Sequence, residues 1–233
     1  MSEIVITENS QGKIGIDYIK NGLSELAGRS FCRVCEEVLG DRLILRITCE
    51  DNFYAVIKSE VIDKVAEVIV IKYKYDYFTR TVKISGLDEM QREILLASLI
   101  AADLETDKKY CVGKLKQLNE IAIDGAFNFR LKALKKKWEE VTGYMPTVFI
   151  SSQLKDFITF LLEDKKEKVY IDEGKVYDSH YKRLKRCNLL GGQGIEIIRE
   201  VLLSNCGSIE LTGKVPEADE KYLKEYYGGK INF

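Results

Sequence analysis

The opening fifty residues combine strand-like and helical patterns of apolar and polar positions. The segment EIVIT alternates as a short strand does, and Ile16, Ile19 and Leu23 then recur at helical spacing. Two further apolar segments surround Gly40 in the manner of the arms of a hairpin. This order predicts a small βαββ unit.

The stretch from Phe53 to Lys83 contains no Gly, Pro or Asn and is rich in Val and Ile. Tyr54, Ile57 and Val61 step by three and four residues, and strands seldom exceed about ten residues, so one long helix is favoured. The later part, IVIKYKYDYF, alternates, which leaves a strand open there.

Helical spacing resumes beyond Ser85, where Asp88 supplies the negative charge that suits a first helical turn. Another helix is expected from Thr106, with Ile121 on its apolar face. Residues 51 to 145 therefore form a mostly helical middle.

The most organised segment is IAIDGAFNFRLKALKKKWEEV, residues 121 to 141. Asp124-Gly125 supplies a cap or a turn, and a helix with a bulky apolar stripe follows. We expect this stripe to pack in the core. Its members step by four, three and four residues: Phe127, Leu131, Leu134 and Trp138.

After Pro146 the period of the pattern changes, and Asp172-Glu173-Gly174 separates two β-branched and aromatic arms as a hairpin turn does. The sequence therefore predicts an α+β fold with a small α/β unit at 1–50, the helical middle at 51–145 and a C-terminal α/β unit at 146–233. These parts are expected to pack as one or two globular domains. The elements expected in the last part are helices at 151–168, 195–203 and 216–227, a hairpin at 168–178, and strands at 208–213 and 231–233.

The charged residues nearly cancel, at a formal net charge of −1. Long-range electrostatics therefore gives no reason to expect a nucleic-acid coat or a membrane surface. The start of the sequence lacks the basic and apolar blocks of a signal peptide, and no apolar run approaches the roughly 20 residues that span a bilayer. We expect a cytoplasmic protein without a transmembrane segment.

The cysteines are expected to be reduced thiols, because the chain shows no export signal. Cys32 and Cys35 have the spacing of half a zinc site or a redox pair, but on a strand they point to opposite faces. His180 is the only histidine, and Ser151-Ser152 is typical of a helix start rather than a nucleophile. We predict no metal, no cofactor and no catalytic residue. A zinc site would have to recruit Cys49, Cys111, Cys187 or Cys206 at irregular spacing.

A glycine-rich loop, Leu190-Gly191-Gly192-Gln193-Gly194, precedes an apolar helix, and its N–H groups offer a binding site to a phosphate. It lacks the Lys-Ser or Lys-Thr of a P-loop and the fuller glycine spacing of a dinucleotide site. A plain loop is favoured, and nucleotide binding through 190–194 remains an alternative.

Basic residues gather in two runs that lie about fifty residues apart. If the runs converge, they can follow a phosphate backbone, with Tyr177 or Tyr181 available to stack on bases. Otherwise they are solvated faces, the first partly neutralised by Glu139 and Glu140. The residues are Arg130, Lys132, Lys135, Lys136 and Lys137 in the first run, and Lys182, Arg183, Lys185 and Arg186 in the second.

The segment Ile123 to Lys132, IDGAFNFRLK, resembles the Asp-Gly-Phe-x-x-Phe-Arg-Leu segment of the YtxC-like proteins, which are sporulation proteins of endospore-forming bacteria. The order of elements is also what this resemblance implies, although Phe127 lies one place later than the family pattern has its first aromatic. The residues that carry the likeness are Asp124, Gly125, Phe127, Asn128, Phe129, Arg130 and Leu131.

The resemblance implies a biological context, sporulation, but neither a catalytic residue nor a ligand. We therefore expect a non-enzymatic protein with a binding or structural role. Its partner is unknown; a protein partner is expected, and nucleic acid is the alternative.

Overall fold

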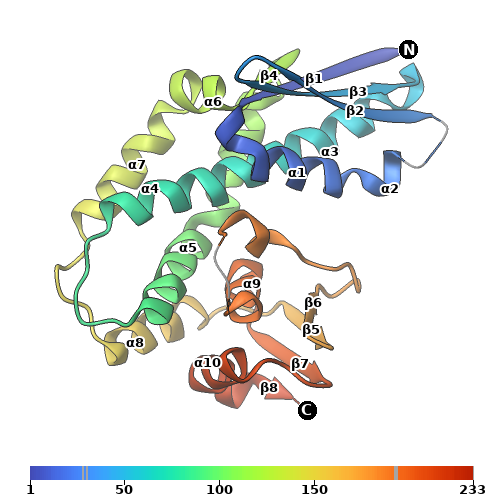
Figure 1. Cartoon of the computed structure of the whole chain (residues 1–233). Coiled ribbons are helices and arrows are strands. Elements are labelled where there is room, and N and C mark those ends of the chain that lie inside the picture. Colours follow the sequence, from blue (N-terminus) through green and yellow to red (C-terminus); the bar gives the residue numbers. More distant parts are fainter. Residues whose placement is uncertain (28, 30, 192–193, 233) are drawn as a thin grey trace. The chain divides into compact units, whose positions relative to one another are not determined.

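The computed structural model describes residues 1–27, 29, 31–191 and 194–232, and Figure 1 shows their elements in order. The fold is α+β as expected, 58% helical and 20% strand, with a long helical middle and small sheets towards both ends. The chain divides into two compact units. The first comprises residues 1–74 and 105–141, and the second 75–104 and 142–233. The helical middle at 51–145 is thus shared between the two units.

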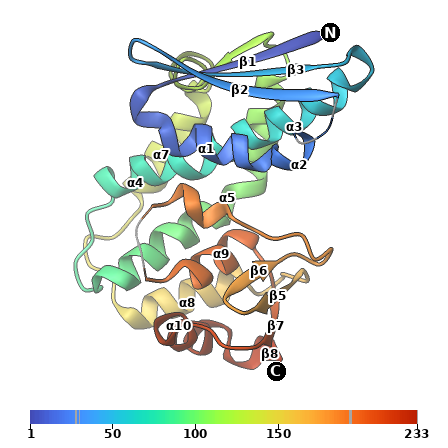
Figure 2. The ribbon, with the colours of Figure 1, turned by 45° about the vertical axis from the view of Figure 1, so that its right-hand side comes forward.

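The sheet of the first unit has the strand order β2-β3-β1-β4. Ile6 of β1 lies opposite Leu45 of the antiparallel β3 and opposite Ile121 of the parallel β4. Helices α1 and α3 lie side by side along one face of this sheet (Figures 1 and 2). The strands are β1 (Ser2–Asn9), β2 (Cys32–Leu39), β3 (Arg42–Cys49) and β4 (Glu120–Ala122).

The expected βαββ order is confirmed, and Gly40 has the positive φ of 61° that its tight turn requires. The fourth strand corrects one expectation, because Ile121 lies in β4 and not in a helix. Its spacing from Leu115 and Leu118 also fits a helix, and only pairing with β1, more than a hundred residues earlier, selects the strand.

One long helical stretch runs from α3 through a π turn into α4. The strand alternative for its later part is therefore wrong. All four side chains from Val68 to Ile71 are buried, so the segment has no solvent-facing side of the kind that alternation in a strand provides. The helical segments up to this point are α1 (Lys13–Gly22), α2 (Ser24–Ala27), α3 (Tyr54–Glu67), the π turn Val68–Tyr73 and α4 (Lys74–Thr81), with 3₁₀ turns at Ser10–Gly12 and Asp51–Phe53.

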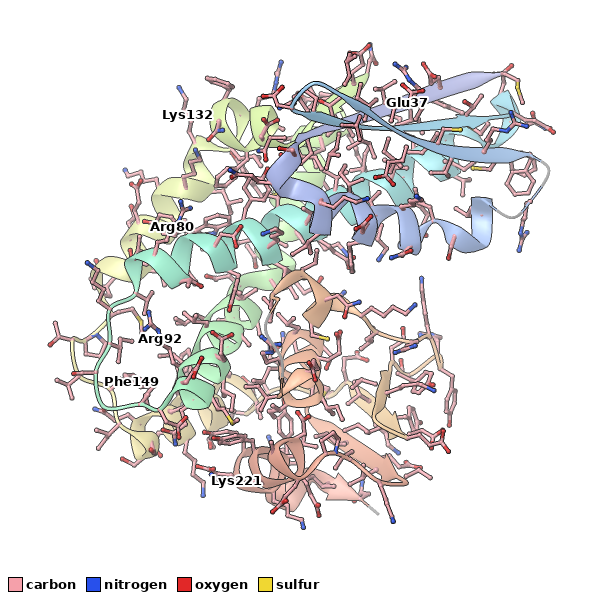
Figure 3. All side chains as sticks on the ribbon, in the orientation of Figure 1. Glu37, Arg80, Arg92, Lys132, Phe149 and Lys221 are labelled. Carbon is pink, nitrogen blue, oxygen red and sulfur yellow. The ribbon has the colours of Figure 1, made fainter. Side chains whose placement is uncertain are left out.

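Helix α5 (Glu89–Leu115) is a single helix where two were expected, and Thr106 lies in its interior. Its start is a reciprocal cap: Asp88 Oδ1 accepts from the Gln91 N–H at 2.8 Å, while Gln91 Oε1 accepts from the Asp88 N–H at 3.3 Å. Ser85 instead forms a parallel bridge with Val148. Arg92 donates to the carbonyl of Val82 at 3.0 Å, close to the end of α4 (Figure 3).

The segment at 121–141 is not one continuous helix, because a π turn and the non-helical backbone of Leu131 interrupt it. A π turn adds one residue to a helical turn, which shifts the side chains that follow. The stripe nevertheless faces the core. Leu131, Leu134 and Trp138 are buried and Phe127 is half-buried. The elements are α6 (Ile123–Gly125), the π turn Ala126–Arg130 and α7 (Lys132–Gly143).

The second unit contains the sheet β6-β5-β7-β8. β5 is parallel to β7 and β7 to β8, and helices α9 and α10 form the crossovers that parallel strands need (Figure 2). The hairpin turn at Glu173 and Gly174 has positive φ at both residues, as expected for a two-residue loop. The elements are α8 (Ser151–Leu161), β5 (Lys168–Asp172), β6 (Lys175–Tyr177), α9 (Glu196–Ser204), β7 (Ser208–Thr212), α10 (Glu217–Tyr227) and β8 (Ile231–Asn232), with 3₁₀ turns at Arg186–Leu189 and Gly228–Lys230.

These elements confirm the order expected after Pro146, and Phe233 lies outside the described residues. Helix α10 begins one residue later than predicted, because Pro216 is its N-cap rather than its first helical residue, and Gly228 follows its end as predicted. Within the described residues, no helix has both the length and the apolar character needed to cross a membrane.

Replacing Trp138 with alanine should lower the free energy of unfolding by about 3 to 5 kcal/mol, because its fully buried ring leaves a cavity. Urea denaturation followed by far-UV circular dichroism measures this loss. Phe160→Ala is the control, since this aromatic residue is 71% exposed and its removal should change stability by less than about 0.5 kcal/mol. A loss below about 1 kcal/mol for Trp138→Ala would contradict its role in the core.

Candidate functional site

A buried carboxylate, Asp107 of α5, fixes helix α7, which follows the family-like segment 123–132 in the first unit. Asp107 Oδ2 accepts from Lys74 Nζ at 2.9 Å and from Trp138 Nε1 at 3.1 Å, and Oδ1 accepts from Lys137 Nζ at 2.8 Å. Burial alone would raise the pKa of Asp107, but Lys74, Lys137 and Trp138 outweigh it and hold that pKa below its ordinary value. The carboxylate therefore stays ionised and joins three helical segments.

A second ion pair fixes the start of the same segment. Arg42 of β3 meets Asp124 with both terminal nitrogens, at 2.5 Å from Nη1 to Oδ2 and 3.0 Å from Nη2 to Oδ1. The hydrogen bond from Arg42 lowers the pKa of Asp124. Asp124 also accepts from the N–H of Gly125 at 2.8 Å. Residues 124 and 125 are thus attached to the sheet rather than acting as a simple helix cap.

Between these two attachments, the chain presents Asn128, Phe129 and Arg130 to solvent. Phe129 is 77% exposed, whereas Phe127 turns inward with its ring centroid 4.7 Å from that of Tyr73 and 5.5 Å from that of Trp138. Arg130 is exposed and forms no ion pair with a carboxylate in the described part of the chain. We call residues 127–130 the FNFR turn.

The first basic run is only partly available to a ligand. Arg130, Lys132 and Lys136 are exposed, and Figure 3 shows Lys132 extending outwards near the start of α7. Lys135 Nζ instead donates to Asn128 Oδ1 at 2.8 Å and lies 4.4 Å from the ring centroid of Phe127. Lys137 binds Asp107. Use of this run as a polyanion site stays a prediction, carried by the three exposed cations.

The second basic run lies in the other unit, after a tight turn at Asp178. Asp178 Oδ1 accepts from the N–H groups of His180 and Lys182, at 2.8 and 2.9 Å. The chain then returns along β6, where Arg183 bridges to Tyr177. Lys182, Arg183 and Lys185 are the accessible members of the run, while Arg186 Nη1 donates to the Leu203 carbonyl at 3.2 Å.

The two aromatic residues suggested for stacking on bases, Tyr177 and Tyr181, are not both freely exposed beside the second basic run. Tyr181 stacks on Tyr170 with the ring centroids 4.6 Å apart, and Tyr177 is half-buried on β6. His180 is exposed, with Ser179 Oγ 3.4 Å from its Nδ1.

A pocket of about 190 Å³ lies in the second unit between the β5–β6 hairpin, the basic run and the start of α9. One of its walls is Glu200, a residue that is only 2% exposed. Glu200 Oε2 accepts from the Cys187 N–H at 2.7 Å, and burial raises the pKa of this carboxyl group. Burial also raises the pKa of the Cys187 thiol, so Cys187 is a poor nucleophile.

Sequence reasoning missed Glu200. A signal was present, because Arg199-Glu200 interrupts an otherwise apolar helix, and charged residues on a buried helix require partners. Arg199 has such a partner in Glu93, at 3.2 Å.

The remaining candidates are the Cys32 and Cys35 pair, a metal site and the glycine-rich loop at 190–194, which lies partly outside the described residues. Cys32 is buried and Cys35 exposed, in keeping with opposite faces of β2. Among the described residues, no group of three or more His, Cys, Asp or Glu residues is placed to hold a metal ion. Gly191 and Gly194 have positive φ, but Gly192 and Gln193 lie outside the described residues, so the phosphate-loop alternative stays untested.

Replacing Asp107 with asparagine should destabilise the first unit by about 3 to 5 kcal/mol at neutral pH, because it removes the counter-charge of the buried Lys74 ammonium. An aspartate whose pKa is lowered by folding stabilises above its unfolded pKa, and this stabilisation is lost as the pH falls through the folded pKa. The difference in the free energy of unfolding between the wild type and the variant should therefore become smaller as the pH is lowered.

Fluorescence of Trp138, the only tryptophan, reports this unfolding in urea at neutral and acidic pH. Asp156→Asn, at an exposed carboxylate of α8, is the matched control and should show no deficit at either pH. If the difference in the free energy of unfolding between wild type and Asp107→Asn is the same at neutral and acidic pH, the ionised state of Asp107 is contradicted.

The chain was compared with family models, curated proteins and solved structures. No family model, curated protein or solved structure matches it.

Proposed function

We propose that this chain is a YtxC-like, sporulation-associated protein that acts by binding a protein partner through the FNFR turn. The observation that carries the proposal is the 77% exposure of Phe129 within the segment that resembles the family. When a partner covers a large aromatic side chain that is exposed to water, the free energy of the system falls. Aromatic residues and arginine are also enriched among the residues that dominate binding.

The attachment of the turn supports the same proposal. The Arg42–Asp124 pair holds its beginning and the Asp107 cluster holds α7 after it. A turn fixed at both ends loses little conformational freedom when a partner binds, so more of the contact energy appears as affinity. Arg130 and Lys132 lie beside Phe129 and add positive charge, which favours an acidic partner surface.

Deletion of the gene in a spore-forming host should lower the yield of heat-resistant spores, and Phe129→Ala should reproduce most of that loss. The variant protein should unfold like the wild type, because the ring is exposed. Phe160→Ala on α8, an equally bulky and exposed change in the other unit, should sporulate normally.

Unchanged spore yield and timing of the deletion strain across several media would remove the sporulation assignment. A deletion phenotype with a normal Phe129→Ala strain would keep the assignment but remove the FNFR turn as the binding surface.

A second function, nucleic-acid binding, is favoured by the exposure of Arg130, Lys132 and Lys136 next to an exposed aromatic ring. Such cations bind phosphates while a ring stacks on unpaired bases. Fluorescence anisotropy with a labelled single-stranded oligonucleotide should then show affinity that falls steeply with salt. Reversing all three charges to glutamate should reduce the slope of log K against log salt by roughly 0.7 for each phosphate that is no longer bound.

The matched control reverses the exposed Lys109, Lys114 and Lys116 of the same unit, which changes the net charge equally. Equal effects of the two triple variants would indicate non-specific attraction, and absent binding at low salt would exclude this function.

A further inference from the structure

The pocket of the second unit has an unusual combination of linings: a buried acid on one wall and three cations around it. Lys175 of β6, Arg183 and Lys185 line it, together with Glu196 and Glu200 of α9. None of the three cations forms an ion pair within the described residues. Glu196 is exposed, and its Oε1 accepts from the Gly194 N–H at 3.3 Å. The three cations outnumber the exposed carboxylate of Glu196, so the rim of the pocket carries a net positive charge.

Only one of the two carboxyl oxygens of Glu200 has a hydrogen-bond partner among the described residues. Oε2 accepts from the N–H of Cys187, but the buried Oε1 has no hydrogen-bond partner among the described residues. Buried polar atoms in native proteins almost always have a partner, so an unsatisfied one on a residue that lines a pocket offers a hydrogen-bonding site to a ligand. Burial raises the pKa of Glu200, which favours the protonated form of its carboxyl group, and the O–H of that form can donate.

We infer that this pocket binds a small molecule through an anionic oxygen group, which accepts hydrogen bonds from Arg183, from Lys175 or Lys185, and from the carboxyl group of Glu200. Phosphate and carboxylate groups share this chemistry. A volume of about 190 Å³ corresponds to roughly six water molecules at about 30 Å³ each, which suits a phosphate or a short dicarboxylate rather than a whole nucleotide. The inference does not depend on the FNFR turn.

Isothermal titration calorimetry on the full chain tests this, with inorganic phosphate and succinate as separate probes in buffer of constant ionic strength. We expect saturable binding of at least one probe. Arg183→Ala should weaken it about tenfold or more, the loss expected for one charge-assisted hydrogen bond. Lys182→Ala is the matched control, because Lys182 is an exposed neighbouring cation that does not line the pocket.

Glu200 provides a second, independent arm. Glu200→Gln keeps an N–H donor at the same place and should bind nearly as tightly as the wild type, whereas Glu200→Leu should bind about tenfold more weakly. Circular dichroism checks that each variant is folded, and the exposed Arg183→Ala keeps the test decisive if a Glu200 variant does not fold.

Binding of phosphate that depends on Arg183 and not on Lys182 supports a phosphate-bearing ligand, and the same pattern with succinate alone supports a carboxylate. Binding that Lys182→Ala weakens as much as Arg183→Ala reflects general surface charge and overturns the inference. The absence of saturable binding with both probes overturns it as well.

Discussion

The carboxylate of Asp107 imposes the constraint on which the first unit depends. An ionised group with a 2% exposed side chain is costly to bury, and the cost is offset only if its hydrogen bonds are all made. Lys74, Lys137 and Trp138 make them from positions 30 to 33 residues away along the chain. Satisfying this group therefore fixes the end of the π turn after α3 and the face of α7 together.

The two units differ in how they treat their buried polar groups. In the first, Glu8 is also buried and accepts from the Tyr73 hydroxyl at 2.6 Å and from the Asn9 N–H at 2.9 Å. In the second, Asp219 of α10 caps α9 by accepting from the Ile198 N–H at 2.8 Å, and burial raises its pKa to about 6. Its Oδ2 and the Oε1 of Glu200 lack partners in the described residues. Satisfied groups stabilise one arrangement, whereas unsatisfied ones favour a bound ligand.

Local patterns in the sequence were sufficient for most elements. The two hairpin turns contain Gly40 and Gly174, which adopt positive φ without the steric cost of a Cβ, and both hairpins formed where expected. The stripe at Leu131, Leu134 and Trp138 is buried, because helical spacing fixes which side chains share a face. The α+β class follows from these signals, each of which spans only a few residues.

The features that the sequence left open or assigned wrongly depend on distant contacts. Ile121 fits a helix by spacing and becomes a strand only beside Ile6. The interruption at Leu131 and the exposed Phe129 lie between the attachments to Arg42 and Asp107, which no local period encodes. The pocket beside Glu200 likewise joins a hairpin, a loop and a helix. The sequence by itself determined which side chains prefer the interior, and the tertiary structure decided which partners they meet there, because burial and pairing are properties of the folded chain.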